Sequence, residues 1–421
     1  MRLAVSDQSQ GLNPMWSLKN GAPAWTPPPT IDPSIGNGQN PPFYNGASAD
    51  TSSSELTYAF NIQRQLTRSS VVEIGYLATL ASDITSNFLA LNQLHYRSLP
   101  ANLSPFTAAG RTLLNSQVGS AAANAAGIVA PWSGFNALWG TGATVGQSLR
   151  PYPQFSTINT LDGGGDRIGH STYHSMTVKF SKRYSSGLTL QASYVLSKLL
   201  TDTDLTAGAT GAVAGSFDAY NYRLLKSISG YDQTHLVKLT YVYELPFGQG
   251  KRFLSNKSIV SAIVGGWRFS GIQNYGSGTP QALATTISLP IFDTTNLPSA
   301  PTYDGWRGSI AGSKFDPNVD KFLQPASYFG TQPTDALGNM TRYNPKLRSM
   351  PSYSENISLA RTIKIHEESR VEFRCESFNL LNRTAFGPLT SANTLQNANF
   401  GLWRNQTNTQ RRIQLALKLY W

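Results

Sequence analysis

The stretch SMTVKFSKRYSSGLTLQASYVLSK at residues 175–198 carries the pattern that decides the fold. Apolar side chains stand at every second position, first at 176–180 and again at 188–196, and the turn residues 185–187 lie between the two runs. A period of two is typical of a strand that is apolar on one face, and glycine between two such runs is typical of a tight turn. The stretch therefore predicts a β-hairpin with one apolar and one polar face.

The same alternation recurs on both sides of this hairpin. Further apolar runs lie at 56–62, 72–80, 237–245, 267–275, 357–365, 371–375 and 413–421. Together with the first hairpin they give nine predicted strands.

The connections between these strands alternate in length. Short links lie at 67–70, 185–187 and 366–369, with a longer one at about 247–265, whereas the long connections span about 82–170, 200–232, 277–351 and 382–408. A transmembrane barrel has short turns at its periplasmic end and long loops at its outer end, and its strands need roughly 9 to 11 residues to cross the membrane. We therefore predict an all-β fold, a partial antiparallel transmembrane β-barrel of about nine strands with a watery lumen.

The rest of the chain is predicted to be largely irregular. Residues 1–54 are rich in proline and form the first region of the predicted organisation, and residues 55–421 form the barrel region. Within the first long connection, residues 108–130 are rich in small side chains and are a candidate helical stretch.

The composition excludes several other classes of protein. Only 14% of the 421 residues are charged, against roughly 25% in an average soluble domain. The longest apolar stretches, such as 121–130 and 259–267, fall well short of the roughly 20 residues of a spanning helix. The 8 Trp, 19 Tyr and 19 Phe argue against disorder. The net charge of +11 comes from scattered residues rather than a basic run, so we expect no nucleic-acid partner.

The chain ends in a regular apolar pattern. Trp421, Leu419, Leu417, Leu415 and Ile413 are the first, third, fifth, seventh and ninth residues counted from the end. This resembles the C-terminal strand signature of outer-membrane β-barrel proteins, and the resemblance implies recognition by the barrel-assembly machinery. The alternative is an ordinary last strand of a soluble sheet.

Several segments together resemble the barrel of Oar-like TonB-dependent outer-membrane receptors. They are 61–66 (NIQRQL), 72–76 (VEIGY), 150–155 (RPYPQF), 171–175 (STYHS) with 182–183 (KR), 192–198 (ASYVLSK), 241–248 (YVYELPFG), 265–267 (GGW), 372–382 (EFRCESFNLLN), 399–401 (NFG) and 417–421 (LKLYW). They extend from about residue 41 to the end.

The resemblance implies a location in the outer membrane of a Gram-negative cell and energised uptake of an unidentified solute. Receptors of this family enclose an N-terminal plug in a barrel of roughly 22 strands. We expect the plug and the signal peptide to be absent from this chain, which we interpret as the C-terminal part of such a barrel. The expected partners are outer-membrane lipid and the barrel-assembly machinery, with the TonB complex reached only through the missing N-terminal part.

Two groups of residues are assigned to the barrel. Tyr194, Tyr241, Tyr243, Trp267 and Tyr420 are candidates for the aromatic girdles at the membrane boundaries. The charged residues Glu244, Glu372, Arg374 and Glu376 alternate onto the predicted lumen face, where we expect a solvated row of charges.

No catalytic or metal-binding pattern is apparent. His170 and His174 lack the Glu of a helical zinc motif, and residues 163–166 (GGGD) lack the context of a phosphate loop. Asp202-Thr203-Asp204 begins like a calcium loop but is not continued by oxygen ligands. The lone Cys375 falls on an apolar strand face, where it acts as a small hydrophobic residue.

We therefore predict that the chain is not an enzyme and holds no cofactor. Two alternatives to a receptor remain open: a structural or adhesive outer-membrane barrel whose loops bind partners, and a soluble secreted β-sandwich.

Deletion of Trp421 is expected to lower the amount of folded protein in the outer membrane several-fold, because the aromatic terminus of the signature is lost. The folded fraction is measured as the heat-modifiable band of outer-membrane fractions on gels. Trp421→Phe keeps an aromatic terminus and serves as the control. An unchanged level after the deletion would count against the signature.

Overall fold

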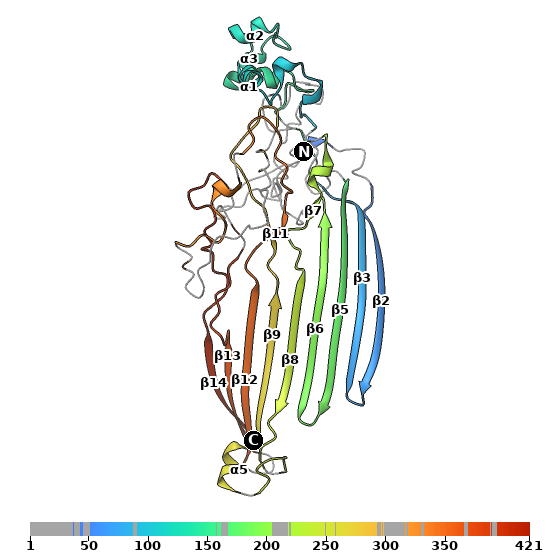
Figure 1. Ribbon diagram of the computed structural model, residues 1–421, viewed down its shortest axis with the longest axis vertical. Coiled ribbons are helices and arrows are strands. Elements are labelled where there is room, and N and C mark those ends of the chain that lie inside the picture. Colours follow the sequence, from blue (N-terminus) through green and yellow to red (C-terminus); the bar gives the residue numbers. More distant parts are fainter. Residues whose placement is uncertain are drawn as a thin grey trace, which may run out of the picture.

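Nine long strands form one antiparallel sheet in the computed structural model of the chain (Figure 1). The structure describes residues 37, 43–44, 51–86, 91–156, 158–160, 167–203, 218, 220–248, 250–256, 258–292, 296, 298, 316, 319–329, 332–365, 369–387, 389 and 394–421. The strands are β2 (Ser54–Thr67), β3 (Ser70–Ile84), β5 (Gly169–Ser185), β6 (Leu188–Thr201), β8 (His235–Glu244), β9 (Trp267–Gly276), β12 (Ser352–Lys364), β13 (Arg370–Phe378) and β14 (Arg412–Tyr420). Each predicted strand is present.

Consecutive long strands pair with each other along the whole sheet, so the sheet is a continuous meander. The order is β2-β3-β5-β6-β8-β9-β12-β13-β14. A short tenth strand, β7 (Ser227–Ile228), pairs with the outer end of β6. Within the described residues, β2 and β14 each pair with one strand and are the two edges of the sheet.

The connections divide between the two ends of the sheet as expected (Figure 1). Tight turns join β2 to β3 and β5 to β6, and the connection from β8 to β9 contains the helix α5 (Ile259–Val264). The predicted turn at 366–369 lies mostly outside the described residues. The connections at the other end are long and carry the remaining helices, which Figure 1 shows beyond the sheet.

The candidate helical stretch at 108–130 contains two short helices rather than one. The helices of this end are α1 (Ala108–Asn115), α2 (Ala121–Ala125), α3 (Phe135–Trp139) and α4 (Val145–Ser148), with 3-10 turns at Tyr96–Ser98, Ala101–Leu103, Gly140–Gly142, Tyr222–Leu225 and Ala326–Phe329. Ser120 begins a new helix because its side chain accepts a hydrogen bond from the Ala123 amide. In the described part of the chain, no helix is long and apolar enough to cross a membrane.

The predicted irregular region 1–54 lies mostly outside the described residues. Its described part includes the short strand β1 (Phe43–Tyr44), which pairs in parallel with β4 (Asn159–Thr160), and the first residue of β2. Two further short strands, β10 (Pro280–Gln281) and β11 (Asn344–Arg348), pair with each other in the long connection between β9 and β12.

The register of the sheet separates apolar from polar residues across all nine strands. Directly paired residues lie on the same face, and Ile74 pairs with Ile62 and Val178, which in turn pairs with Tyr194. Following these pairs from β2 to β14 leads along one mostly apolar face, interrupted by residues such as Glu355 and Arg361, and leaves most of the polar residues on the other. We call these the apolar face and the polar face.

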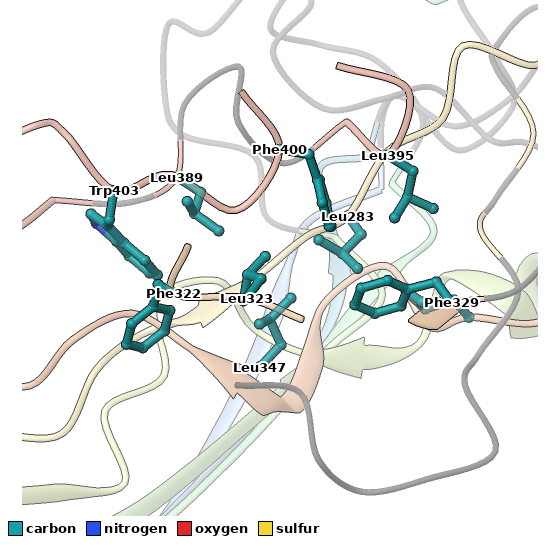
Figure 2. Packing of buried hydrophobic residues seen from close by; sticks show 10 residues of the cluster. Leu283, Phe322, Leu323, Phe329, Leu347, Leu389, Leu395, Phe400 and Trp403 are labelled. Atoms are coloured by element: carbon teal, nitrogen blue, oxygen red, sulfur yellow. The ribbon is translucent and has the colours of Figure 1, made fainter. Parts of the chain in front are cut away.

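Core packing between elements lies in the long connections rather than against the sheet. One cluster of buried residues joins the β9–β12 connection to the β13–β14 connection; Figure 2 shows its members, among them Leu283, Phe322, Leu323, Phe329, Leu347, Leu389, Leu395, Phe400 and Trp403. The rings of Phe322 and Trp403 meet edge to face at 4.5 Å. A second cluster joins the β3–β5 connection to the β9–β12 connection; its buried residues are Leu94, Leu103, Leu114, Ala123, Val145, Leu289, Ile291 and Phe292. The long connections therefore form a packed cap.

The turn between β5 and β6 depends on a glycine. Ser186 and Gly187 have φ values of 54° and 82°, the pattern of a type I′ hairpin turn. A Cβ on Gly187 would lie 2.9 Å from the carbonyl oxygen of Glu244.

Gly187→Ala is expected to destabilise the protein by about 1–2 kcal/mol from the positive φ alone, and further because of this contact with Glu244. Gly127→Ala is the matched control, because Gly127 also has a positive φ of 71° but nothing within 4 Å of its Cβ position. Urea unfolding in detergent measures both. Equal effects would show that the contact with Glu244 costs nothing.

Candidate functional site

The apolar face is exposed over most of its area. Phe60, Leu415 and Leu417 have exposed fractions of 63%, 67% and 74%. A soluble protein rarely exposes so large a contiguous apolar surface. The face therefore needs an apolar surrounding.

Aromatic side chains gather toward both ends of the apolar face. At the short-turn end, Tyr241 contacts Phe269, with ring centroids 5.5 Å apart, and Trp267 contacts Phe373 at 6.1 Å. Toward the cap, Tyr275 contacts Tyr353 at 6.1 Å. Trp267 and Tyr275 are eight residues apart on β9, which corresponds to about 27 Å along the strand. Two aromatic rows at this separation match the girdles that flank a lipid-facing band.

Four of the five predicted girdle residues lie on the apolar face. Tyr243 pairs with Phe269, and Tyr194 pairs with Val237 nearer the cap. The Tyr194 hydroxyl also shares a 2.8 Å hydrogen bond with Nδ1 of His235. Tyr420 differs, because it pairs with Arg370 on the polar face and has the Arg370 guanidinium 4.5 Å from its ring centroid. We therefore leave Tyr420 out of the proposed girdle. The alternation of the terminal strand already placed Tyr420 with the polar residues.

The predicted assembly residues form one row on the edge strand β14. Ile413, Leu415, Leu417 and Leu419 pair with residues of β13 on the apolar face, and Trp421 follows directly with an exposed fraction of 89%. Cys375, opposite Leu415, also lies on this face as predicted. Recognition of this row by the assembly machinery stays a prediction.

The polar face carries a connected group of charges at β9 and β13. Arg374 donates to Oε1 of Glu372 at 2.5 Å and contacts Oε1 of Glu376 at 3.5 Å, while Arg268 lies 4.0 Å from Glu372. The predicted charge row is thus brought together: Glu244 pairs directly with Arg268 across β8 and β9, and it also binds Lys251 at 2.8 Å near the short-turn end. A hollow of about 500 Å³ opens beside this group; Thr240, Val242, Ser270, Asn356 and Phe378 line it with Arg268, Arg374 and Glu376.

The cap is fastened to the sheet by a buried carboxylate that the sequence did not single out. Asp232 has a side chain only 1% exposed, and its Oδ2 accepts from Arg348 of β11 at 2.7 Å. Its Oδ1 accepts from the Leu199 amide of β6 at 2.7 Å. No local motif marks Asp232, because its carboxylate partners Arg348 and Leu199 come from distant parts of the chain, while the Thr234 hydroxyl, which donates to Oδ2 at 3.1 Å, is a neighbour in the sequence.

The described residues that were considered as ion ligands, His170, His174 and Asp202, form hydrogen bonds within the protein. His170 donates its amide to Asp202 Oδ1 at 2.6 Å, and its ring Nδ1 lies 3.2 Å from Oδ2. His174 shares a 2.8 Å hydrogen bond with the Tyr76 hydroxyl on the apolar face. Asp204 and residues 163–166 lie outside the described residues.

The pKa of Tyr96, in the cap, is shifted by its surroundings. Burial, and then the hydrogen bond that Tyr96 donates to Asp218 at 2.9 Å, raise the pKa of the Tyr96 hydroxyl above its ordinary value. This hydroxyl is therefore a hydrogen-bond donor throughout the physiological range.

A single-layer sheet with an exposed apolar face, a charged opposite face and its longest connections gathered at one end defines a β-barrel protein of the outer membrane. The family model for the outer membrane beta barrel domain matches residues 2–414. The chain belongs to this family and is located in the outer membrane. This excludes the alternative of a soluble β-sandwich. No curated protein matches the sequence.

Solved outer-membrane proteins resemble the chain at low identity. The outer membrane transporter YddB from Escherichia coli shares 9% identity at a TM-score of 0.39, with 87% of this chain and 32% of that chain covered. The pyoverdine outer membrane receptor FpvA from Pseudomonas aeruginosa PAO1 shares 6% identity at a TM-score of 0.36, with 87% of this chain and 30% of that chain covered. The ferric-catecholate import receptor Fiu from E. coli K12 shares 9% identity at a TM-score of 0.30, with 86% of this chain and 35% of that chain covered. The chain spans about a third of the length of these proteins.

Val178→Arg is expected to destabilise the protein in a bilayer by about 2–4 kcal/mol, because it places a charge at mid-height on the lipid-contacting face. Thr177→Arg puts the same charge on the polar face one residue away and is expected to change stability by less than about 1 kcal/mol. Urea unfolding in liposomes compares the two. Equal costs would contradict the assignment of the faces.

Proposed function

We propose that the chain is the C-terminal barrel part of a TonB-dependent outer-membrane receptor that takes up a solute with energy from the inner membrane. The sequence segments that resemble Oar-like receptors carry this proposal, because they are spread over the whole sheet rather than confined to one motif. The polar face supports it, since the group of Arg268, Glu372 and Arg374 stands where a lumen wall would contact a plug or a passing solute.

The geometry of the charged group suits a wall that binds a partner surface. Glu372 has a side chain 11% exposed, whereas Arg268 is 44% exposed beside it. The carboxylate is thus largely covered and held by Arg374, and the guanidinium of Arg268 keeps donors for a partner. An acidic group on a plug or on a solute would complement it.

The proposal includes the rest of the barrel. Among the residues that the structure describes, the edge strands β2 and β14 each leave one side of their backbone unpaired, and each unpaired group costs several kcal/mol in lipid. In the full-length receptor further strands would pair with these edges and enclose the plug, and the TonB complex would bind the plug side. The polar face would then line a closed lumen.

The second candidate is a structural or adhesive barrel. The observation that favours it is the packed cap, whose buried clusters give the long connections a defined outer surface. Such a surface binds partners without transport. A plug in the full-length protein would distinguish a receptor from this candidate.

Solute uptake is tested by mass spectrometry of spent medium from a strain that carries the gene, from its deletion mutant and from a mutant that lacks TonB. We expect at least one solute to remain in the medium of both mutants, because transport needs both the barrel and the energy source. Complementation with the full-length gene is the control and should restore depletion. Loss of depletion only in the gene deletion, or no difference at all, would contradict energised uptake.

A further inference from the structure

The connection between β8 and β9 is unlike the tight turns at the same end of the sheet. The turn at 186–187 is two residues long, whereas this connection carries α5, in which Ile259, Val260 and Ile263 have exposed fractions of 80%, 56% and 61%. Ser261 is the buried residue of this helix. A short helix that turns nearly all of its apolar side chains outward needs an apolar surrounding of its own.

Two hydrogen bonds place α5 on the lipid side of the sheet. The indole N–H of Trp267 donates to the carbonyl oxygen of Ile263 at 3.1 Å, and the guanidinium of Arg361 donates to the carbonyl oxygen of Ala262. Trp267 and Arg361 pair with each other on the apolar face, and the guanidinium lies 5.7 Å from the Trp267 ring centroid. The last turn of α5 is therefore held by side chains that project from the apolar face.

The residues before α5 extend the same apolar surface and add positive charge. Phe253 and Leu254 have exposed fractions of 47% and 44%. Arg252 is exposed, with its guanidinium 5.4 Å from the Phe253 ring centroid, and Lys251 is anchored to Glu244. Apolar and aromatic side chains beside basic ones are typical of segments that lie in a membrane interface, where the cations meet lipid phosphates.

We propose that residues 252–256 and 258–264 are an interfacial membrane anchor that inserts into the periplasmic leaflet of the outer membrane. Phospholipid is the occupant: its acyl chains cover Phe253, Leu254 and the apolar side chains of α5, and its phosphate groups contact Arg252. We infer lipid rather than a protein because the anchor is continuous with the lipid-facing side of the sheet. Trp267 and Arg361 lie on the apolar face and also bind the last turn of α5. The anchor does not depend on transport and holds equally for a structural barrel.

A quenching experiment on the full chain in phospholipid vesicles tests the anchor. In a Cys375→Ser background, Ile263→Cys carries an environment-sensitive fluorophore, and quenching by nitroxide-labelled phospholipid is compared with quenching by aqueous iodide. Leu190→Cys, on the apolar face near the same end, is the lipid control, and Arg68→Cys, in the polar turn between β2 and β3, is the water control. We expect lipid quenching at position 263 to lie within about twofold of that at position 190 and about fivefold above that at position 68.

Val260→Cys repeats the measurement in case Ile263→Cys folds poorly, and a circular dichroism spectrum of each labelled variant checks the fold. Iodide quenching as strong as at position 68 would overturn the proposal, because the helix would then lie in water. Protection from both quenchers would overturn it as well, since a protein surface rather than lipid would then cover the helix.

Discussion

Inside a bilayer, a backbone N–H or C=O without a partner costs several kcal/mol, so the chain has to satisfy its own hydrogen bonds there. The continuous ladder from β2 to β14 meets this constraint for every strand except at its two edges. The same ladder fixes the side-chain faces, because a slip of one residue would turn an entire apolar row toward water. Register is therefore the property on which the faces, the girdles and the charged group all depend.

The two ends of the sheet are built in different ways. At the cap end, buried clusters and the Asp232–Arg348 pair tie long connections to one another and to β6 and β11. At the other end the tight turns need little packing, and the apolar surface of α5 faces outward. The cap is held together by protein contacts, whereas we infer that lipid completes the short-turn end. This difference follows from where the chain has enough residues to build a core.

The strands were predictable from the sequence because alternation is a local signal. β12 shows the limit of this signal. The strand begins at Ser352, before the apolar run that begins at Ile357. The missed residues place Glu355 on the apolar face, where Arg383 from the β13–β14 connection binds it at 2.9 Å. A carboxylate there is compatible with the strand only because of a partner that is distant in the sequence.

Neither the cap nor α5 was predictable from the sequence, and the two reasons are related. The residues that form the cap clusters, such as Leu283 and Trp403, follow no period, and they meet only because two connections fold together. The run IVSAIV at 259–264 is short and apolar, and such a run does not distinguish a helix from a strand. The charges of the polar face were predicted as a row, but the contact between Arg268 and Glu372 required the register of β9, β12 and β13.

A nitroxide scan along β8 from His235 to Glu244 in a bilayer tests whether one face of the sheet contacts lipid and the other water. Collision rates with oxygen report lipid and those with a nickel chelate report water. We expect alternation with a period of two, with oxygen maxima at Val237, Leu239 and Tyr241 and nickel maxima at Lys238, Thr240 and Val242. Equal nickel accessibility at all positions would contradict it, because both faces would then be in water.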